Sequence, residues 1–339
     1  MTDPTPTPTA SAPATVSVQR VSDAPIVAAG AVAGYGPIFN AGLIRQDGIF
    51  HLFARGVRDG YRRNGGAGAR FLDYVSDVLV FTSPDGDAYA FQQVLARSSP
   101  EGVNCYEDPR VQRIQTADGE QIVMSYTNLP APETGRPWRV GVHRLAYAAG
   151  RFELNASSGA VIGPENQPDK DAVLFNLRDG RVGLIHRIAP NMQLALFDSL
   201  EELWGAGPDY WDAHMRDLHT HTILTPTPGA LAVGAGAPPV ETAEGLLLFF
   251  HEREASGEYT VRVALLDPAT GRVSAQLPEP IMRPELEWER SGDVDNVVFV
   301  QGALARGDGR IYLTYGASDR HVGAATVETA ALLTALRAA

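Results

Sequence analysis

Two short strings of charged residues carry the most suggestive chemistry in this chain. One reads Glu-Asp-Pro-Arg at residues 107–110, and the other reads Asp-Lys-Asp at residues 169–171. A residue before proline is held in extended geometry, so the first string is expected at a strand entry. Neighbours in a strand point to opposite faces, and only one of Glu107 and Asp108 is therefore expected to face a site. A carboxylate beside cations suits general acid or base catalysis, although a solvated ion-paired turn would also account for either string.

Further polar residues stand close to other apolar runs. They are His186 with Arg187, a Gly-Ala-Gly-Ala-Pro-Pro string at 234–239 that leads through Glu241 to His251, and Asp319 after a Tyr-Gly pair. Glycine and proline in the second of these let the backbone pass close to another group. Asp217, His219 and His221 have the spacing of metal ligands on one strand face, but no fourth ligand accompanies them, so no metal site is predicted.

A repeated turn predicts the strands that must position these residues. An acidic residue followed by glycine recurs five times, each time opening an apolar strand, and successive glycines lie roughly 61 to 71 residues apart. A near-constant period with one unit per repeat is typical of radial architectures, and four-stranded units of this size make a propeller. The five turns are Asp47-Gly48, Asp118-Gly119, Asp179-Gly180, Glu244-Gly245 and Asp308-Gly309. The charged strings at 107–110 and 169–171 precede their turns by similar offsets, which predicts equivalent positions near one end of a shared channel.

We therefore expect an all-β fold, a five-bladed β-propeller with a short C-terminal helix, as a single catalytic domain over residues 19–339. Residues 1–18 are rich in Pro, Thr and Ala and are expected to form a disordered tail. A short helical turn is predicted at Ser199–Trp204 and a C-terminal helix within Ala324–Ala339. The segment Gly205–Thr222 is predicted to be a long loop, and such loops are often functional.

Composition excludes several classes of partner. A net charge of −12 and a pI near 5.1 argue against a nucleic-acid ligand. No stretch reaches the roughly 18 apolar residues that would span a membrane. Cys105 is the single cysteine, so no intrachain disulfide forms and a cytoplasmic setting is expected. The sequence leaves open whether the chain forms a homo-oligomer.

Taken together, these strings resemble glycoside hydrolase family 130, the β-mannoside phosphorylases and β-mannosidases built on five-bladed propellers. The resemblance runs from about Pro37 to Val327. The family pattern is an Asn near the first strand (here Asn40), Glu-Asp-Pro-Arg, Asp-Lys-Asp-x-x-Leu-Phe, His-Arg, Gly-x-Gly-x-Pro-Pro, and Asn-Val-Val-Phe followed by Tyr-Gly-x-x-Asp. All are present in that order. The chain departs from the pattern at Ile188, where proline is usual, at Glu252, where glycine is usual, and at Val300 and Gln301, where Pro-Cys is usual.

The resemblance implies an inverting β-mannoside phosphorylase, which converts a β-mannosyl oligosaccharide and inorganic phosphate into α-mannose 1-phosphate and a free acceptor sugar. Asp108 would be the general acid, acting through the mannose 3-hydroxyl. Holding a phosphate dianion against an oxocarbenium-like centre needs converging cationic and donor groups. Those groups would be Lys170, His186, Arg187 and His251. Substrate would be bound by Asn40, Arg55, Glu107, Arg110, Asp171, Glu241 and Asp319, with phosphate as co-substrate and no cofactor.

Two alternatives remain open at this stage. One is an inverting β-mannosidase of the same family, in which Glu241, with Glu252 behind it, would activate water. The other is a carbohydrate-binding propeller without catalytic activity, because one fold can host unrelated functions.

Overall fold

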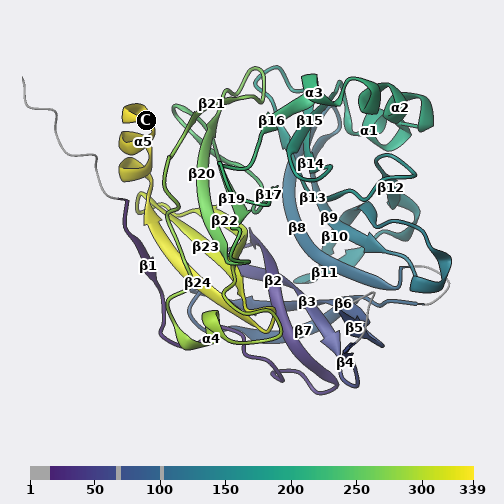
Figure 1. The fold of residues 1–339 in the computed structure, drawn as a ribbon, viewed down its shortest axis with the longest axis vertical. Coiled ribbons are helices and arrows are strands. Elements are labelled where there is room, and N and C mark those ends of the chain that lie inside the picture. Colours follow the sequence, from purple (N-terminus) through teal and green to yellow (C-terminus); the bar gives the residue numbers. More distant parts are fainter. Residues whose placement is uncertain (1–15, 66–69, 100–102) are drawn as a thin grey trace, which may run out of the picture.

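Antiparallel strands make up most of the molecule. The computed structural model describes residues 16–65, 70–99 and 103–339. Its main strands fall into five antiparallel groups, which follow one another along the chain and around the middle of the molecule (Figure 1). The predicted predominance of strands is confirmed.

The first two groups share one nine-stranded sheet, because a parallel bridge joins Ser76 to Cys105. Group one consists of β2 (Tyr35–Gln46), β3 (Ile49–Arg58), β6 (Ser76–Ser83) and β7 (Ala90–Ala96). Group two consists of β8 (Cys105–Thr116), β9 (Gly119–Leu129) and β10 (Arg139–Ala148), with β11 (Arg151–Leu154) and β12 (Ala160–Ile162) both paired to β10. A separate ribbon pairs β4 (Arg62–Arg63) with β5 (Phe71–Leu72).

The remaining three groups are separate sheets. Group three consists of β13 (Lys170–Asn176), β14 (Val182–Arg187), β15 (Met192–Phe197) and β16 (Thr222–Leu224). Group four consists of β17 (Ala232–Ala235), β18 (Val240–Thr242), β19 (Gly245–Arg253), β20 (Tyr259–Leu266) and β21 (Val273–Gln276). Group five consists of β22 (Val298–Ala305), β23 (Arg310–Ala317), β24 (His321–Glu328) and, from the start of the chain, β1 (Val18–Arg20).

The five acidic-glycine turns open the strand that pairs with the first strand of each group, namely β3, β9, β14, β19 and β23. All five glycines have positive φ, from 81° at Gly48 to 148° at Gly245. Glycine adopts this geometry without the steric penalty that a Cβ would add. The sequence period is therefore the spacing of one hairpin per group.

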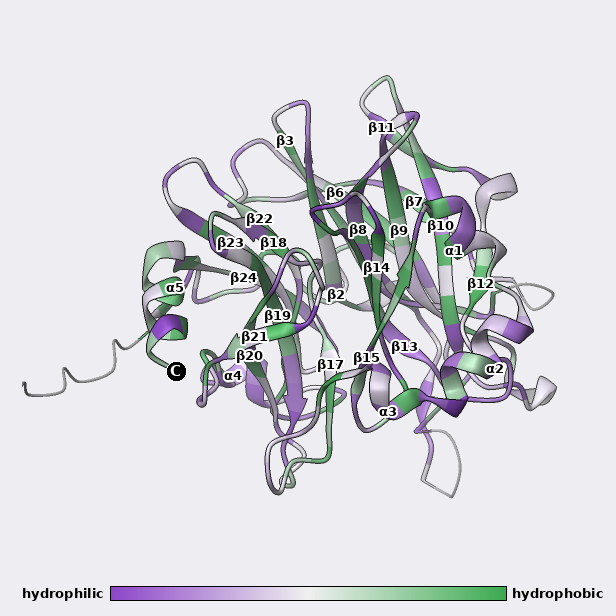
Figure 2. Cartoon of the chain, turned by 90° about the horizontal axis from the view of Figure 1, so that it is seen from above, coloured by the Kyte–Doolittle hydropathy of each residue, from purple (hydrophilic) through white to green (hydrophobic). Residues whose placement is uncertain are grey.

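The hydrophobic core is divided among the interfaces between groups. Five clusters of buried residues are found, and each lies mainly between two successive groups, including the last and the first. For example, Leu52 of β3 and Tyr312 of β23 belong to one cluster, and Leu247 of β19 and Leu313 of β23 belong to another. Figure 2 shows hydrophobic residues along the strands, whereas the projecting loops are mainly hydrophilic.

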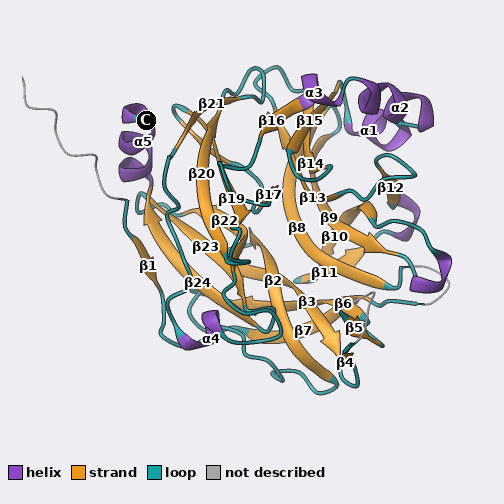
Figure 3. Ribbon diagram, viewed as in Figure 1, coloured by secondary structure: helices purple, strands orange, loops and turns teal. Residues whose placement is uncertain are grey.

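Short helices lie outside the strand groups (Figure 3). They are α1 (Leu200–Gly205), α2 (Pro208–Arg216), α3 (Leu218–His221), α4 (Glu287–Arg290) and α5 (Thr329–Ala338), with 3-10 turns at Pro132–Thr134 and Ala156–Ser158. The predicted turn at Ser199 is confirmed, since its hydroxyl accepts from the Glu202 amide at 3.1 Å. The predicted C-terminal helix is also confirmed, but it begins at Thr329, because 324–328 belong to β24.

Two predictions need correction. The segment Gly205–Thr222 is mostly helical rather than a loop, because Trp211 and His214 bury one side of α2. Of the predicted disordered tail, residues 1–15 lie outside the described residues, but Val16 and Val18 pack on the core and Val18 pairs with Val327. Over the described ranges, none of the helices has the length and apolar character needed to cross a membrane.

Candidate active site

The first strands of three neighbouring groups share one irregularity. Asn40 in β2, Asp108 in β8 and Asp171 in β13 all have left-handed backbone, with φ of 46°, 52° and 54°. At each point the pairing register with the next strand shifts. Such bulges redirect side chains, and non-glycine residues with positive φ are concentrated at functional sites. Three polar side chains are thereby redirected at equivalent positions of neighbouring groups.

These bulges surround a cavity of about 100 Å³. Eight predicted site residues line it: Asn40, Arg55, Glu107, Asp108, Lys170, Arg187, His251 and Asp319. A wider cleft of about 740 Å³ shares Arg55, Glu107, Lys170 and Asp319 with it. The structure therefore brings together residues from all five strand groups or the loops beside them.

Asp108 is held by two neighbours on the inner side of the cavity. Its Oδ1 accepts from Asn40 Nδ2 at 2.7 Å and lies 3.4 Å from an Arg55 terminal nitrogen. Only 4% of Asp108 is exposed. The Tyr-Gly motif is explained here, because a Cβ on Gly316 would collide with Asn40 Oδ1. Asn40 can thus approach Asp108 only if residue 316 lacks a side chain.

Glu107 lines the same cavity as Asp108, which corrects the expectation that only one of them could face it. The left-handed backbone at Asp108 interrupts the strand alternation on which that expectation rested. Glu107 forms an ion pair with Arg55, whose guanidinium also lies over the ring of Tyr74 at 5.2 Å. Burial raises the pKa of Glu107 above its usual range, although Arg55 acts in the opposite direction.

A third carboxylate in the cavity belongs to Asp319. Burial raises the pKa of Asp319 to about 7; Arg55 opposes this rise, and the neighbouring Asp108 and Glu107 add to it. Asp319 therefore changes charge near neutral pH. A protonated carboxyl can donate a hydrogen bond that a carboxylate cannot.

The basic side of the cavity is built across the β13–β14 pair and β19. Lys170 is paired in register with Arg187. An Arg187 terminal nitrogen lies 3.0 Å from Asp171 Oδ2 and 3.4 Å from His251 Nε2. Burial lowers the pKa of His251 to about 4, although Asp171 opposes this. His251 is therefore a neutral hydrogen-bonding group, and Lys170 and Arg187 supply the positive charge.

Arg110 and Asp171 do not line the cavity, which corrects their predicted substrate contacts. Arg110 is fully buried and donates to the carbonyl oxygens of Ala235 and Gly236, each at 2.7 Å, and to that of Asp108 at 3.1 Å. It thereby braces β8 against β17. The Gly-rich string has a separate cause: a Cβ on Gly236 would meet the Val300 carbonyl oxygen, and a Cβ on Gly234 would meet Asp171 Oδ2.

Asp171 contacts Arg187 and His251 but does not itself line the cavity. It is 1% exposed and lies 3.4 Å from both Arg110 and His251 as well as close to Arg187. Burial alone would raise the pKa of Asp171, but Arg187, His251 and Lys170 together hold it well below its usual range. Arg110 and Asp171 are therefore positioning residues.

His186 is also misplaced by the sequence prediction, because it lies on the opposite face of β14 from Arg187. It is fully buried, with Nδ1 2.9 Å from Asp169 Oδ2 and Nε2 3.1 Å from His214 Nε2. His214 in turn stacks on His221 at 4.0 Å. We call Asp169, His186, His214 and His221 the histidine cluster. It lies between β14 and the helices α2 and α3 and does not line the cavity.

Neither carboxylate predicted for water activation is in the site. Glu241 is exposed and lines a different cavity, of about 390 Å³, with residues such as Gln112 and Phe175 from farther along the first strands. Glu252 is fully buried, where it pairs with Arg262 at 2.8 Å and accepts from Thr227. Both lie away from Asp108 because β18 and the outward face of β19 carry them.

Sequence reasoning missed several residues of the cavity wall. Arg70, Tyr259 and Phe299 line it, and the Phe299 ring packs on His251 with 4.1 Å between ring centroids. Phe299 belongs to the Asn-Val-Val-Phe motif and could have been identified from it, whereas Arg70 and Tyr259 have no local signal.

No group of three or more His, Cys, Asp or Glu side chains within the described ranges is arranged to hold a metal ion. His219 and His221 lie in the helix α3, so the strand spacing considered for a metal site does not apply.

Comparison with known proteins agrees with the motifs. A family model described as beta-1,4-mannooligosaccharide phosphorylase matches residues 16–338. Two similar curated proteins come from Thermoanaerobacter sp. (strain X514). One, a 1,2-beta-oligomannan phosphorylase, is 29% identical over 322 residues, which are 92% of this chain and 98% of that protein. The other, a beta-1,2-mannobiose phosphorylase, is 30% identical over 295 residues, which are 86% and 90% of the two chains.

A solved structure also shares this fold. Beta-1,2-mannobiose phosphorylase from Listeria innocua, in complex with beta-1,2-mannobiose, superposes with a TM-score of 0.75 at 19% identity. The match covers 95% of this chain and 99% of that one. Since the family model spans almost the whole described chain, this protein belongs to glycoside hydrolase family 130, a family of mannoside phosphorylases.

Proposed function

We propose that this chain is an inverting β-mannoside phosphorylase, which uses inorganic phosphate to release α-mannose 1-phosphate from a β-mannosyl saccharide. The observation that carries the proposal is the division of one small cavity into an acidic side and a basic side. Asp108 and Glu107 stand on the first, and Lys170 and Arg187 stand on the second with neutral His251.

The acidic side fits the departure of the leaving sugar. As the bond between the anomeric carbon and the glycosidic oxygen breaks, its electron pair goes to that oxygen, which must gain a proton. Asp108 is the proton donor, with the mannose 3-hydroxyl as the relay. Asn40 and Arg55 hold its carboxyl in place, which limits the motion needed during transfer.

The basic side fits the attacking phosphate. A phosphate oxygen forms the new bond to the anomeric carbon from the face opposite the leaving sugar, which inverts the configuration. Arg187 offers a fork of donors suited to phosphate, Lys170 adds a compact charge, and His251 adds a hydrogen bond. Asp171 orients Arg187 from behind at 3.0 Å.

The alternative of water as the attacking group has less support. An inverting hydrolase needs a second carboxylate as a base, facing the anomeric carbon across a water molecule. Glu241 lies on another cavity and Glu252 is engaged in a buried ion pair. Glu107 is paired to Arg55 on the same side as Asp108.

We further propose that the five strand groups are the blades of a five-bladed propeller. The first strands of successive groups contact one another: β2 with β8, β8 with β13, β13 with β17, and β22 with β2. Group four reaches β22 through β18 and β19. The five core clusters between successive groups support the same arrangement. Asp108 and Lys170 would then stand at one end of the axis and Glu241 near the other.

The test is incubation with a panel of β-mannosyl disaccharides of different linkage, with and without inorganic phosphate. Products are followed by phosphorus and proton NMR. Mannose 1-phosphate of α configuration, formed only with phosphate, is the expected result. Free mannose at a rate independent of phosphate would identify a hydrolase, and binding without turnover of any substrate would favour a carbohydrate-binding protein.

A further inference from the structure

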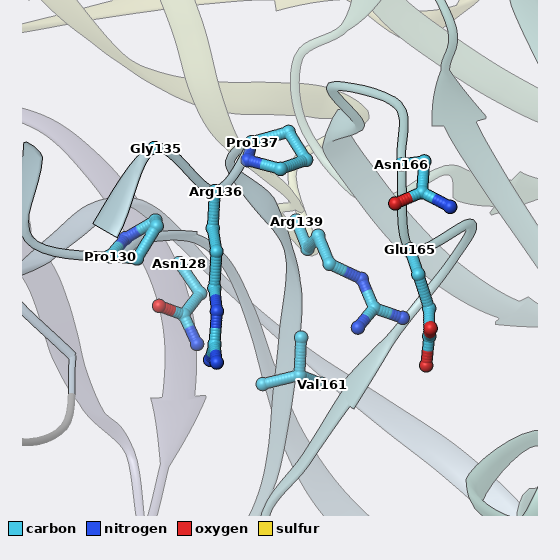
Figure 4. A pocket seen from close by; sticks show the side chains of 9 residues that line it. All are labelled: Asn128, Pro130, Gly135, Arg136, Pro137, Arg139, Val161, Glu165 and Asn166. Atoms are coloured by element: carbon cyan, nitrogen blue, oxygen red, sulfur yellow. The ribbon is translucent and has the colours of Figure 1, made fainter.

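Another cavity, of about 590 Å³ (Figure 4), shares Pro130 with the proposed catalytic cleft. Its walls come from the end of β9, the connection to β10, the start of β10, and the segment from β12 toward β13. The polar side chains that line it are Asn128, Arg136, Arg139, Glu165 and Asn166, which we call the distal cavity residues. None of them was singled out by the sequence motifs.

The distal cavity is continuous along the chain with the catalytic cleft. Pro130 lines both, and its neighbours Leu129 and Pro132 line the cleft of about 740 Å³. The segment that carries Glu165 and Asn166 runs directly into Lys170 of the catalytic cavity. A sugar chain that leaves the cleft past Pro130 would therefore reach the distal cavity.

The polar groups of the distal cavity have unused hydrogen-bonding capacity. Within the described part of the chain, the side chains of Asn128, Arg136, Glu165 and Asn166 make no hydrogen bond or ion pair with other residues. Arg139 donates to the Gly163 carbonyl oxygen, but its Nε is buried without a partner. In Figure 4 Arg139 lies between Arg136 and Glu165. The exposed side chains Arg136, Glu165 and Asn166 are therefore available to a ligand, and Arg139 Nε is the one buried atom of these described side chains that lacks a partner.

The mixture of groups selects a hydroxylated ligand over an anion. Guanidinium groups only donate, a carboxylate only accepts, and side-chain amides do both. A sugar hydroxyl can donate and accept and so can pair with all three kinds of group, whereas a phosphate or sulfate anion would be repelled by the Glu165 carboxylate. Pro130, Pro137 and the exposed Val161 add apolar surface for the ring faces of a sugar.

We propose that the distal cavity binds a sugar unit beyond the acceptor residue, so that the enzyme favours β-mannosyl oligosaccharides over the disaccharide. This inference rests on the proposed function, because it assumes that the neighbouring cleft holds a β-mannoside. In this proposal the distal cavity residues set the preferred length of the substrate, and the bond is broken in the catalytic cavity.

The kinetic test compares kcat/KM for a β-mannosyl disaccharide and for the matching tri- and tetrasaccharides at saturating phosphate. The double variant Arg136→Ala/Asn166→Ala removes two exposed side chains of the cavity. Loss of one or two hydrogen bonds predicts a decrease of about fivefold to tenfold for the longer substrates. The disaccharide serves as the internal reference, since it is too short to reach the cavity. Arg178→Ala, an exposed arginine of the β13–β14 turn, is the matched control.

A binding test separates this inference from the proposed function. Calorimetric titration of the tetrasaccharide into Asp108→Asn protein, with and without the double substitution, needs no turnover. Tighter binding of the tetrasaccharide than of the disaccharide, abolished by the double substitution, is the expected result. Equal affinity for both lengths, or equal effects of the substitution on both, would overturn the distal subsite. Failure of the wild type to phosphorolyse any β-mannoside would instead count against the proposed function.

Discussion

The two faces of the β13–β14 pair both carry charged and polar residues, but one face lines the cavity and the other is buried. On the cavity face, Lys170 and Arg187 line a space that solvent and substrate can reach. One residue earlier in each case, the fully buried Asp169 and His186 join the start of β13 to β14 in the histidine cluster. Of each pair of adjacent residues, one lines the cavity and the other is buried in the histidine cluster behind it.

The electrostatics of the two faces differ accordingly. On the buried face, burial lowers the pKa of His214 to about 3, and the neighbouring His186 and His221 contribute to this. His214 is therefore neutral at physiological pH. On the cavity face, Arg187 forms an ion pair with Asp171 at 3.0 Å. Lys170 and Arg187 line the cavity and can therefore meet a ligand, whereas His186 and His214 are buried against each other with 3.1 Å between their Nε2 atoms.

The largest effect is expected on the acidic side of the cavity. Asp108→Asn preserves size and the contact with Asn40 but removes the proposed proton donor, so kcat should decrease by about a thousandfold or more. The unfolding midpoint and the affinity for mannoside should change little. Turnover near the wild-type level would exclude Asp108 as the general acid.

Arg187→Ala should affect phosphate far more than mannoside. Loss of charge-assisted hydrogen bonds predicts an increase of about tenfold to a hundredfold in the KM for phosphate. The KM for mannoside at saturating phosphate should change less than about threefold, because mannoside lies on the other side. Arg187→Lys is the matched control, since it keeps the charge without the fork. An unchanged phosphate dependence would contradict the proposed phosphate site.

His186→Asn tests whether the buried face supports the fold or shapes the phosphate site. It removes one hydrogen bond of the histidine cluster, and the free energy of unfolding should decrease by about 1–3 kcal/mol in urea titrations. The KM for phosphate should rise less than in Arg187→Ala, with the KM for mannoside unchanged. A larger phosphate effect than that of Arg187→Ala would mean that the two faces do not divide the work as described.

The smallest effect is expected from the titration of Asp319. Its pKa is raised to about 7 from an ordinary 3.8, so its neutral form predominates below pH 7 and it gains negative charge above that pH. The extra charge beside Glu107 and Asp108 should repel phosphate. The ratio of wild-type to Asp319→Asn KM for phosphate should rise roughly threefold between about pH 6 and 8. Taking this ratio cancels the titration of phosphate itself.

The raised pKa of Asp319 also predicts how the stability of the fold changes with pH. A group whose pKa is higher in the folded state contributes stability that is lost as pH rises through the folded value. Relative to Asp319→Asn, the wild type should therefore lose stability between about pH 4 and 7. A ratio of KM values and a stability difference that are both independent of pH would show that Asp319 ionises normally.

Much of the fold followed from local patterns. The acidic-glycine turns predicted five hairpins because positive φ at glycine is a local property. The apolar strands expected after the five turns are confirmed as β3, β9, β14, β19 and β23. The helices of 205–222 were missed because their stability depends on burying Trp211 and His214 against group three.

The sequence by itself determined which residue types gather near the strand entries, since the motifs of 107–110 and 169–171 follow from chain order and turn spacing. Only the tertiary structure decided which of them face the cavity. Side-chain direction depends on bulges such as that at Asp108, which place Glu107 and Asp108 on one cavity and leave His186 behind the sheet. Bulges and strand register are set by pairing with strands distant in sequence, and no local pattern encodes them.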